Sequence, residues 1–287
     1  MNARTEKVLY SAQKTEITEH YIYQKLARTL KDEANRNVLL LIAKDELAHY
    51  RLWKSHTGKS ARPNWAMVWF YYLISRVFGI SFGLKLMEHG ENTANEAYSA
   101  LASEIPDAGG IAGEEDEHEQ QLLQMINEER LEYVGSMIRG LNDALVELTG
   151  AMAGFTLALQ ESRLVAMVGL ITGIAACLSM ACTEYLAIKS EKTRNPLKSA
   201  VYTGTTYVLT VLFLVVPYIL IPNVFIALAV MIVIAVIIIL VFNFYIAVAR
   251  DEPFVKRFLE MVLISLGVAA LSFGIGYLIR EVLGVNI

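Results

Sequence analysis

Residues 226–249 read IALAVMIVIAVIIILVFNFYIAVA, and Ile, Val, Leu and Ala make up nearly all of this run. It holds no charged residue and exceeds the roughly 20 apolar residues with which a helix crosses a bilayer. Such a composition predicts a membrane helix, whose limits we place at 224–249. Four more stretches of the second half have comparable length and apolar content, at residues 137–160, 164–187, 200–221 and 258–280. We therefore expect five membrane spans.

The basic residues near the span ends predict how the spans are oriented, because short loops rich in Lys and Arg stay in the cytoplasm. The loops after the second and fourth spans contain seven of them: Lys189, Lys192, Arg194, Lys198, Arg250, Lys256 and Arg257. The opposite side has only Arg163 and Arg280. The N-terminus lacks the apolar core of a signal peptide. We expect an integral protein of the cell membrane, with its N-terminal half in the cytoplasm and its C-terminus on the opposite side.

The charged residues divide the 287-residue chain at about residue 136. The first part contains 15 of the 25 basic and 20 of the 29 acidic residues. This pattern predicts a water-soluble domain at 1–136, followed by a membrane domain at 137–287. The chain has no excess of basic charge, so we do not expect nucleic acid as a partner. Both cysteines, Cys177 and Cys182, lie in an apolar stretch, which excludes a secreted scaffold held by disulfides.

The first half contains a weak internal repeat that predicts a helical bundle. Residues 42–49, IAKDELAH, match residues 111–118, IAGEEDEH. Four helices are expected, at about 3–29, 34–57, 64–104 and 110–134, so the fold class is all-α: a cytoplasmic four-helix bundle followed by a five-helix transmembrane domain. A span at 65–86 would put the two copies on opposite sides of the membrane. We expect a crossover helix there instead, with its aromatic side chains covered by the bundle, a partner subunit or the membrane surface.

Each copy of the repeat contains Glu-x-x-His, which places both side chains on one face of a helix. The motif residues and the glutamate upstream of each motif are Glu46, His49, Glu115, His118, Glu16 and Glu91. Two such helices, with a Glu from each of two others, form the ligand set of carboxylate-bridged two-metal sites. These ligands suit iron, or manganese or zinc as a substitute, better than metals that prefer thiolates. A single Glu-x-x-His is usually a solvated helix face, so it is the repetition that indicates a metal site.

Further polar residues near these motifs have two interpretations. Tyr23 and Tyr98 can hydrogen-bond the metal site or belong to an ordinary core. Glu19, Glu88 and His89 can be auxiliary ligands, although a solvated helix face is the commoner role for such residues. The sequence leaves both alternatives open.

Ionisable residues inside membrane spans are candidate functional groups, because a charge in lipid is costly. Asp143 and Glu147 lie on one face of the first span, and Met180 and Glu184 lie one turn apart in the second. Carboxylates with a thioether can bind a borderline cation such as Fe(II). The competing interpretation places Asp143 and Glu184 at the cytoplasmic ends of the spans, in water. The small residues near Gly150 predict close packing of the first span in a homodimer.

The doubled pattern of Glu-x6-Tyr and Glu-x-x-His resembles the rubrerythrin branch of the ferritin-like superfamily. The resemblance extends over residues 5–134. It implies a ferritin-like four-helix bundle with a di-iron centre. Members of this branch oxidise Fe(II) or reduce peroxide.

Three segments resemble the vacuolar iron transporter family: GLNDA at 140–144, SMACTEYL at 179–186 and KSE at 189–191. The resemblance covers about 137–281. It implies five spans and a homodimer with the ion path between the first two helices of each subunit, which moves Fe(II) or Mn(II) out of the cytoplasm against protons. Asp143 and Met180 match the family's translocation-site Asp and Met. Glu184 matches the acidic position beside its Tyr-Leu pair.

The sequence therefore favours an exporter of iron or manganese whose N-terminal bundle binds metal, with oxidation of Fe(II) by the bundle left open. The rival hypothesis is an enzyme, a membrane-anchored di-iron ferroxidase or peroxidase whose spans serve only as an anchor. An anchor needs neither Asp143, Glu147 and Met180 nor five spans, which favours transport. The membrane tether argues against a closed storage cage.

Overall fold

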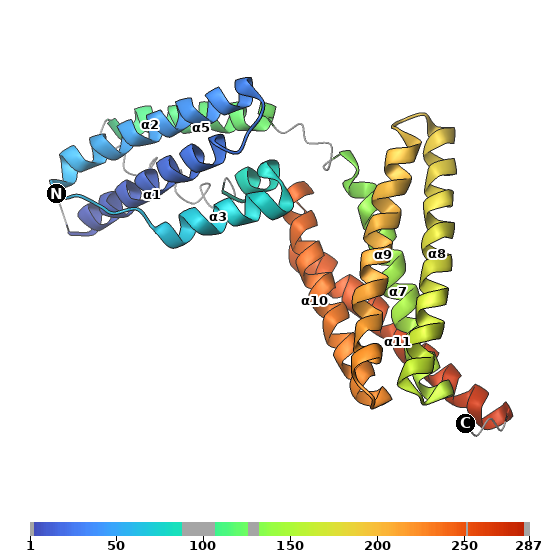
Figure 1. The fold of residues 1–287 in the computed structure, drawn as a ribbon. Helices are drawn as coiled ribbons and strands as arrows, with labels where there is room; N and C mark the ends of the chain where they lie inside the picture. The colour runs from blue at the N-terminus through green and yellow to red at the C-terminus, as the bar shows by residue number, and fades with distance from the viewer. Residues whose placement is uncertain (1–2, 88–106, 126–131, 251, 284–287) are drawn as a thin grey trace. The chain divides into compact units, whose positions relative to one another are not determined.

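The computed structural model describes residues 3–87, 107–125, 132–250 and 252–283. The regular structure within these ranges is entirely helical, which confirms the all-α prediction for them. The chain divides into two compact units, residues 1–128 and 129–287. Figure 1 shows the helices of both units.

The first unit is built on the antiparallel pair α1 (Ala3–Ala27) and α2 (Glu33–Thr57), with α3 (Trp65–Phe78) against α1 and α5 (Asp107–Met125) against α2 (Figure 1). The carboxylate of Asp32 starts α2 by accepting the backbone N–H of Asn35 at 2.8 Å, as an N-cap residue does. Apolar side chains fill the space between the helices: Ile22, Tyr23, Leu26, Leu39, Ile42 and Val68. Part of the predicted four-helix bundle falls on residues 88–106, outside the described residues.

The prediction of one continuous helix over 64–104 is wrong, because α3 ends at Phe78. Gly79 follows with φ of 102°, a backbone conformation that glycine adopts without the strain of a side chain. The chain is helical again over residues 80–87. With 14 residues, α3 alone is shorter than the roughly 20 residues with which a helix crosses a bilayer, and the expectation that 65–86 is not a span stays a prediction.

The outer face of α3 keeps its large apolar side chains in contact with solvent. Trp65, Trp69, Phe70 and Leu73 are each at least half exposed, whereas Val68 is buried against α1 and α2. Within the described part of the chain, the bundle therefore covers only one side of this helix. We predict that a partner subunit or the membrane surface covers the other side.

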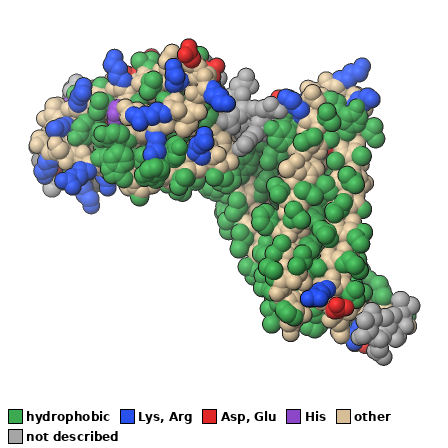
Figure 2. All heavy atoms as spheres, viewed as in Figure 1, with side chains coloured by type: hydrophobic (Ala, Val, Ile, Leu, Met, Phe, Trp, Pro, Cys, Tyr) green, Lys and Arg blue, Asp and Glu red, His purple; other side chains and the backbone are tan. Residues whose placement is uncertain are grey.

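The second unit contains α7 (Val134–Leu159), α8 (Ser162–Glu191), α9 (Pro196–Leu220), α10 (Val224–Arg250) and α11 (Phe254–Leu283). The last four are long and apolar enough to span a membrane. Less than half of each apolar segment is buried inside the unit, and Figure 2 shows hydrophobic side chains covering its visible face. So large an exposed apolar surface needs lipid around it. The structure thus supports four spans among the described residues, and α7 as a fifth span remains a prediction.

Glycines let α7 approach its neighbours closely. A side chain at Gly140 would collide with the carbonyl oxygen of Thr203 on α9. One at Gly150 would press on Val268 of α11, and one at Gly154 would press on Ser272. The small residues that we expected at a subunit interface are therefore partly used within the chain. They give no support to a homodimer.

Candidate metal centre

Three helices of the first unit bring acidic and histidine side chains to one buried point. Glu16 comes from α1, Glu46 and His49 from α2, and Glu115 from α5, and each offers an atom within 4.8 Å of the others. Glu46 and His49 point the same way because three residues nearly complete a helical turn. The surrounding core holds the charged groups away from water, so that Glu16 and Glu46 are each only 1% exposed.

The two histidines lie on either side of Glu46. His49 Nδ1 is 3.7 Å from Glu46 Oε2, and His118 Nδ1 is 3.4 Å from Glu46 Oε1. Glu115 bridges the same pair, at 3.2 Å from His49 Nδ1 and 3.7 Å from His118 Nδ1. The ring centroids are 6.0 Å apart. Five of the six predicted ligands thus lie together: Glu16, Glu46, His49, Glu115 and His118. The sixth, Glu91, lies outside the described residues, as do Glu88, His89 and Tyr98.

The outer nitrogen of each histidine meets a carboxylate that the sequence analysis missed. His49 Nε2 is 2.6 Å from Glu114 Oε2, and His118 Nε2 is 3.4 Å from Asp45 Oδ2. A carboxylate of each helix therefore orients the histidine of the other helix, and the Nδ1 atom of each ring faces the centre of the cluster. Carboxylates orient metal-bound histidines in the same way. A sequence signal existed, because an acidic residue directly precedes the motif glutamate in both copies of the repeat.

Trp53 is a second residue that the sequence analysis missed. Its indole N–H donates a hydrogen bond of 3.0 Å to Glu16 Oε1, and its side chain is fully buried. Trp53 stands seven residues after Glu46, which returns it to the same face of α2. It positions the Glu16 carboxylate from outside the cluster.

Burial and the close contacts within the cluster shift the pKa values of its side chains. Burial raises the pKa of Glu16 to about 8. Burial opposes the charge on His118, but contacts with Glu115 and Glu46 outweigh it and raise the pKa of His118 to about 10. The pKa of His49 rises for the same reason, chiefly through Glu115 and Glu16. Burial of Glu46 is in turn outweighed by both histidines, which lower its pKa.

These residues fit a metal ion. Three buried atoms of the group, Glu46 Oε2, His49 Nδ1 and His118 Nδ1, make no hydrogen bond to the described part of the chain, although such atoms are normally satisfied. The donors are carboxylate oxygens and imidazole nitrogens, which suit iron, manganese or zinc. The arrangement is therefore compatible with a metal site.

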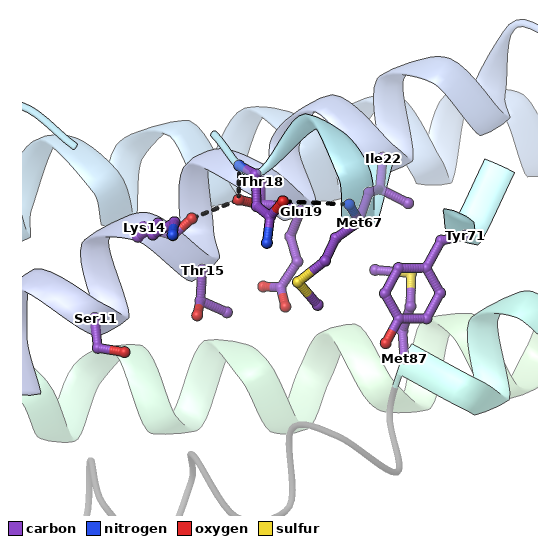
Figure 3. A pocket seen from close by; sticks show the side chains of 10 residues that line it. Ser11, Lys14, Thr15, Thr18, Glu19, Ile22, Met67, Tyr71 and Met87 are labelled. Atoms are coloured by element: carbon purple, nitrogen blue, oxygen red, sulfur yellow. Dashed lines mark hydrogen bonds between the residues drawn. The ribbon is translucent and has the colours of Figure 1, made fainter. Parts of the chain in front are cut away.

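Glu19 lies apart from this cluster, on a cavity of about 270 Å³ beside α1 and α3. Figure 3 shows its carboxylate in the cavity with the thioether of Met67. Thr18 joins the two helices there, since its Oγ donates to the Lys14 carbonyl at 2.6 Å and accepts the Asn64 backbone N–H at 2.9 Å. Tyr23 is 2% exposed and packs in the apolar core.

The predicted pathway residues of the second unit have different surroundings. Glu147 on α7 is exposed and accepts a hydrogen bond of 3.0 Å from the hydroxyl of Tyr207 on α9. Asp143, one turn away, is half-buried. Met180 packs, partly buried, against the apolar core of the unit.

Glu184 is buried, contrary to the interpretation that places it in water, with 3% of its side chain exposed. Ser136 and Arg139 on α7 hold its carboxylate, and neither residue was singled out from the sequence, nor was Tyr207. Nothing in a single sequence announces such partners, because they lie more than 40 residues apart along the chain.

Comparison with known proteins places the second unit in a family. Residues 134–195 and 191–277 match the VIT family. No curated protein matches the chain.

Proposed function

Because this chain belongs to the VIT family, the vacuolar iron transporters, through residues 134–277, half of its length, we propose that it exports Fe(II) or Mn(II) from the cytoplasm. Family membership and the apolar helices make it an integral membrane protein that transports divalent metal. The finer proposal adds a direction, a path through α7 and α8, and a supply of metal from the first unit.

The position of Glu147 is the observation that best supports this path. It is an exposed carboxylate within a helix that packs among membrane spans, where lipid contact would be costly. Asp143 lies one turn away on the same side of α7. A second copy of the chain facing this side would cover both carboxylates and double the number around a cation. We therefore propose a homodimer with a shared, carboxylate-lined path.

Proton antiport follows from the same carboxylates. A carboxyl group such as Asp143 can bind a divalent cation in one state and a proton in the other, which couples opposite movements of the two. The basic residues near the span ends support an orientation with the first unit in the cytoplasm. Metal then leaves the cytoplasm and protons enter.

The first unit supplies metal in this proposal. Its buried cluster of Glu16, Glu46, His49 and Glu115 would bind cations before they reach the membrane path. The same cluster supports a second candidate function, a membrane-anchored ferritin-like ferroxidase or peroxidase. Bound iron would supply the redox chemistry, and the carboxylates and histidines would hold it.

The experiment is Fe(II) flux into sealed inside-out vesicles, measured against metal concentration. Asp143→Asn should abolish flux, because the amide keeps the shape and removes the charge that balances the cation. The double variant Glu46→Ala, Glu115→Ala should lower flux only when metal is scarce. Glu281→Gln, an exposed carboxyl at the far end of α11, is the control and should behave as wild type.

The opposite pattern would overturn this division of labour. If the double variant carried no iron at any concentration while Asp143→Asn carried it normally, the first unit rather than Asp143 would be required for transport. Oxidation of Fe(II) by vesicles in which no iron crosses the membrane would favour the enzyme.

A further inference from the structure

Glu184 is a buried carboxylate whose two oxygens are both bound by the same arginine. Arg139 Nε donates to Glu184 Oε2 at 2.8 Å, and Arg139 Nη2 donates to Oε1. Oε1 also accepts the Ser136 hydroxyl at 2.7 Å. This two-pronged pairing is the strongest geometry that a guanidinium offers a carboxylate. The carboxylate is thereby fully compensated without a metal ion.

We infer that Arg139 is a tethered cation that occupies Glu184 when no metal is bound and must leave before a metal ion can use that carboxylate. The inference rests on the proposed function and on the prediction from the sequence that Glu184 belongs to the pathway. A buried carboxylate needs a compensating charge, and a guanidinium provides one permanently because it does not lose its proton. Unlike a proton, it is covalently attached and cannot cross the membrane with the metal.

The surroundings allow Arg139 to move. Its side chain is 44% exposed, whereas that of Glu184 is 3% exposed, so the guanidinium enters the pair from the open side. Glu191, an exposed carboxylate two turns further along α8, also attracts Arg139 and offers it a second partner in water.

A neighbouring arginine favours the release of Arg139. A Cβ built at Gly135 would lie 3.2 Å from Arg250 Nη2 and 3.8 Å from Arg139 Nη1, so both guanidinium groups lie over this glycine. Like charges this close repel each other, which weakens the hold of Glu184 on Arg139. Because Gly135 has no side chain, both guanidinium groups have space beside it.

The pairing of Arg139 with Glu184 determines the metal concentration at which the site fills. A site that is in its binding-competent state only part of the time binds metal more weakly, because its apparent dissociation constant is the intrinsic value divided by that fraction. If Arg139 pairs with Glu184 about nine-tenths of the time, its removal strengthens metal binding about tenfold by this relation. A purely structural role, in which the pair holds α7 against α8, predicts no such gain.

The test measures binding of Mn(II) to the full-length protein in detergent, with Glu46→Ala and Glu115→Ala present in every sample to disable the cluster of the first unit. We expect Arg139→Gln to lower the dissociation constant about tenfold. Arg139→Lys should give a smaller decrease, because a single ammonium keeps the charge but lacks the fork. Arg163→Gln, an exposed arginine at the opposite end of α8, should leave binding unchanged.

Adding Glu184→Gln completes the test, because the gain from Arg139→Gln should then disappear. An unchanged or higher dissociation constant in folded Arg139→Gln, judged by size-exclusion elution, would overturn the inference. So would a gain that persists with Glu184→Gln. If Arg139→Gln does not fold, an unchanged value for Arg139→Lys decides against the inference. Binding does not require transport, so a protein that binds as expected yet moves no iron contradicts the proposed function alone.

Discussion

Replacing Glu46 by Gln should weaken metal binding in the first unit by about two orders of magnitude while leaving the helices folded. The amide has nearly the same size and shape, so the buried packing changes little. It lacks the charge, however, and Glu46 is the carboxylate that lies between the two histidines.

The magnitude follows from the distances. Glu46 lies 3.4 Å from His118 Nδ1 and 3.7 Å from His49 Nδ1, the atoms that a cation would approach. At an effective dielectric constant of 20, one unit charge at these separations is worth about 4.9 and 4.5 kcal/mol. If water and relaxation recover about half of one such interaction, ~2.5 kcal/mol of binding free energy is lost. This loss corresponds to a ~60-fold larger dissociation constant.

The assay is anaerobic titration of the full-length protein in detergent with Mn(II), with bound metal counted per chain after dialysis. Glu117→Gln is the matched control, because Glu117 lies on α5 beside the ligands but is exposed. The reasoning fails if Glu46→Gln binds metal with wild-type affinity and stoichiometry. It also fails if Glu117→Gln loses metal to the same extent.

Two further predictions concern protons and assembly. Metal binding at pH 7 should release up to about three protons, from Glu16, His49 and His118. The pKa values of all three are raised above 7 before metal binds, and each group must lose its proton to bind a cation. Metal affinity should therefore rise with pH, and a pH indicator in weak buffer that shows no acidification would contradict this. Cysteines introduced along the exposed side of α7, near Glu147, should cross-link two chains in the membrane, and a protein that transports metal as a monomer would refute the shared path.

Much of the metal cluster was predictable because its signal is local. The repeat identified five of the side chains that converge, since residues three apart share a helix face whatever the rest of the chain does. The carboxylates beside them, Asp45 and Glu114, were visible in the same repeat but had no assigned role, because their partners lie on the opposite helix. The continuous helix expected over 64–104 failed at Gly79, where an isolated glycine in an apolar run does not by itself signal a break.

Hydropathy alone identified the membrane helices, from α8 to α11, because transfer of apolar side chains into lipid is a property of composition and length. The roles of the charged residues in that unit depended on the packing of the helices. Glu184 is paired with an arginine and Glu147 with a tyrosine, each on another helix and far along the chain. Such pairs depend on helix register and on close approaches such as that of Gly140 to Thr203, which no local pattern encodes. Individual helices therefore follow from their own residues, whereas the partners of these two carboxylates follow only from how those helices meet.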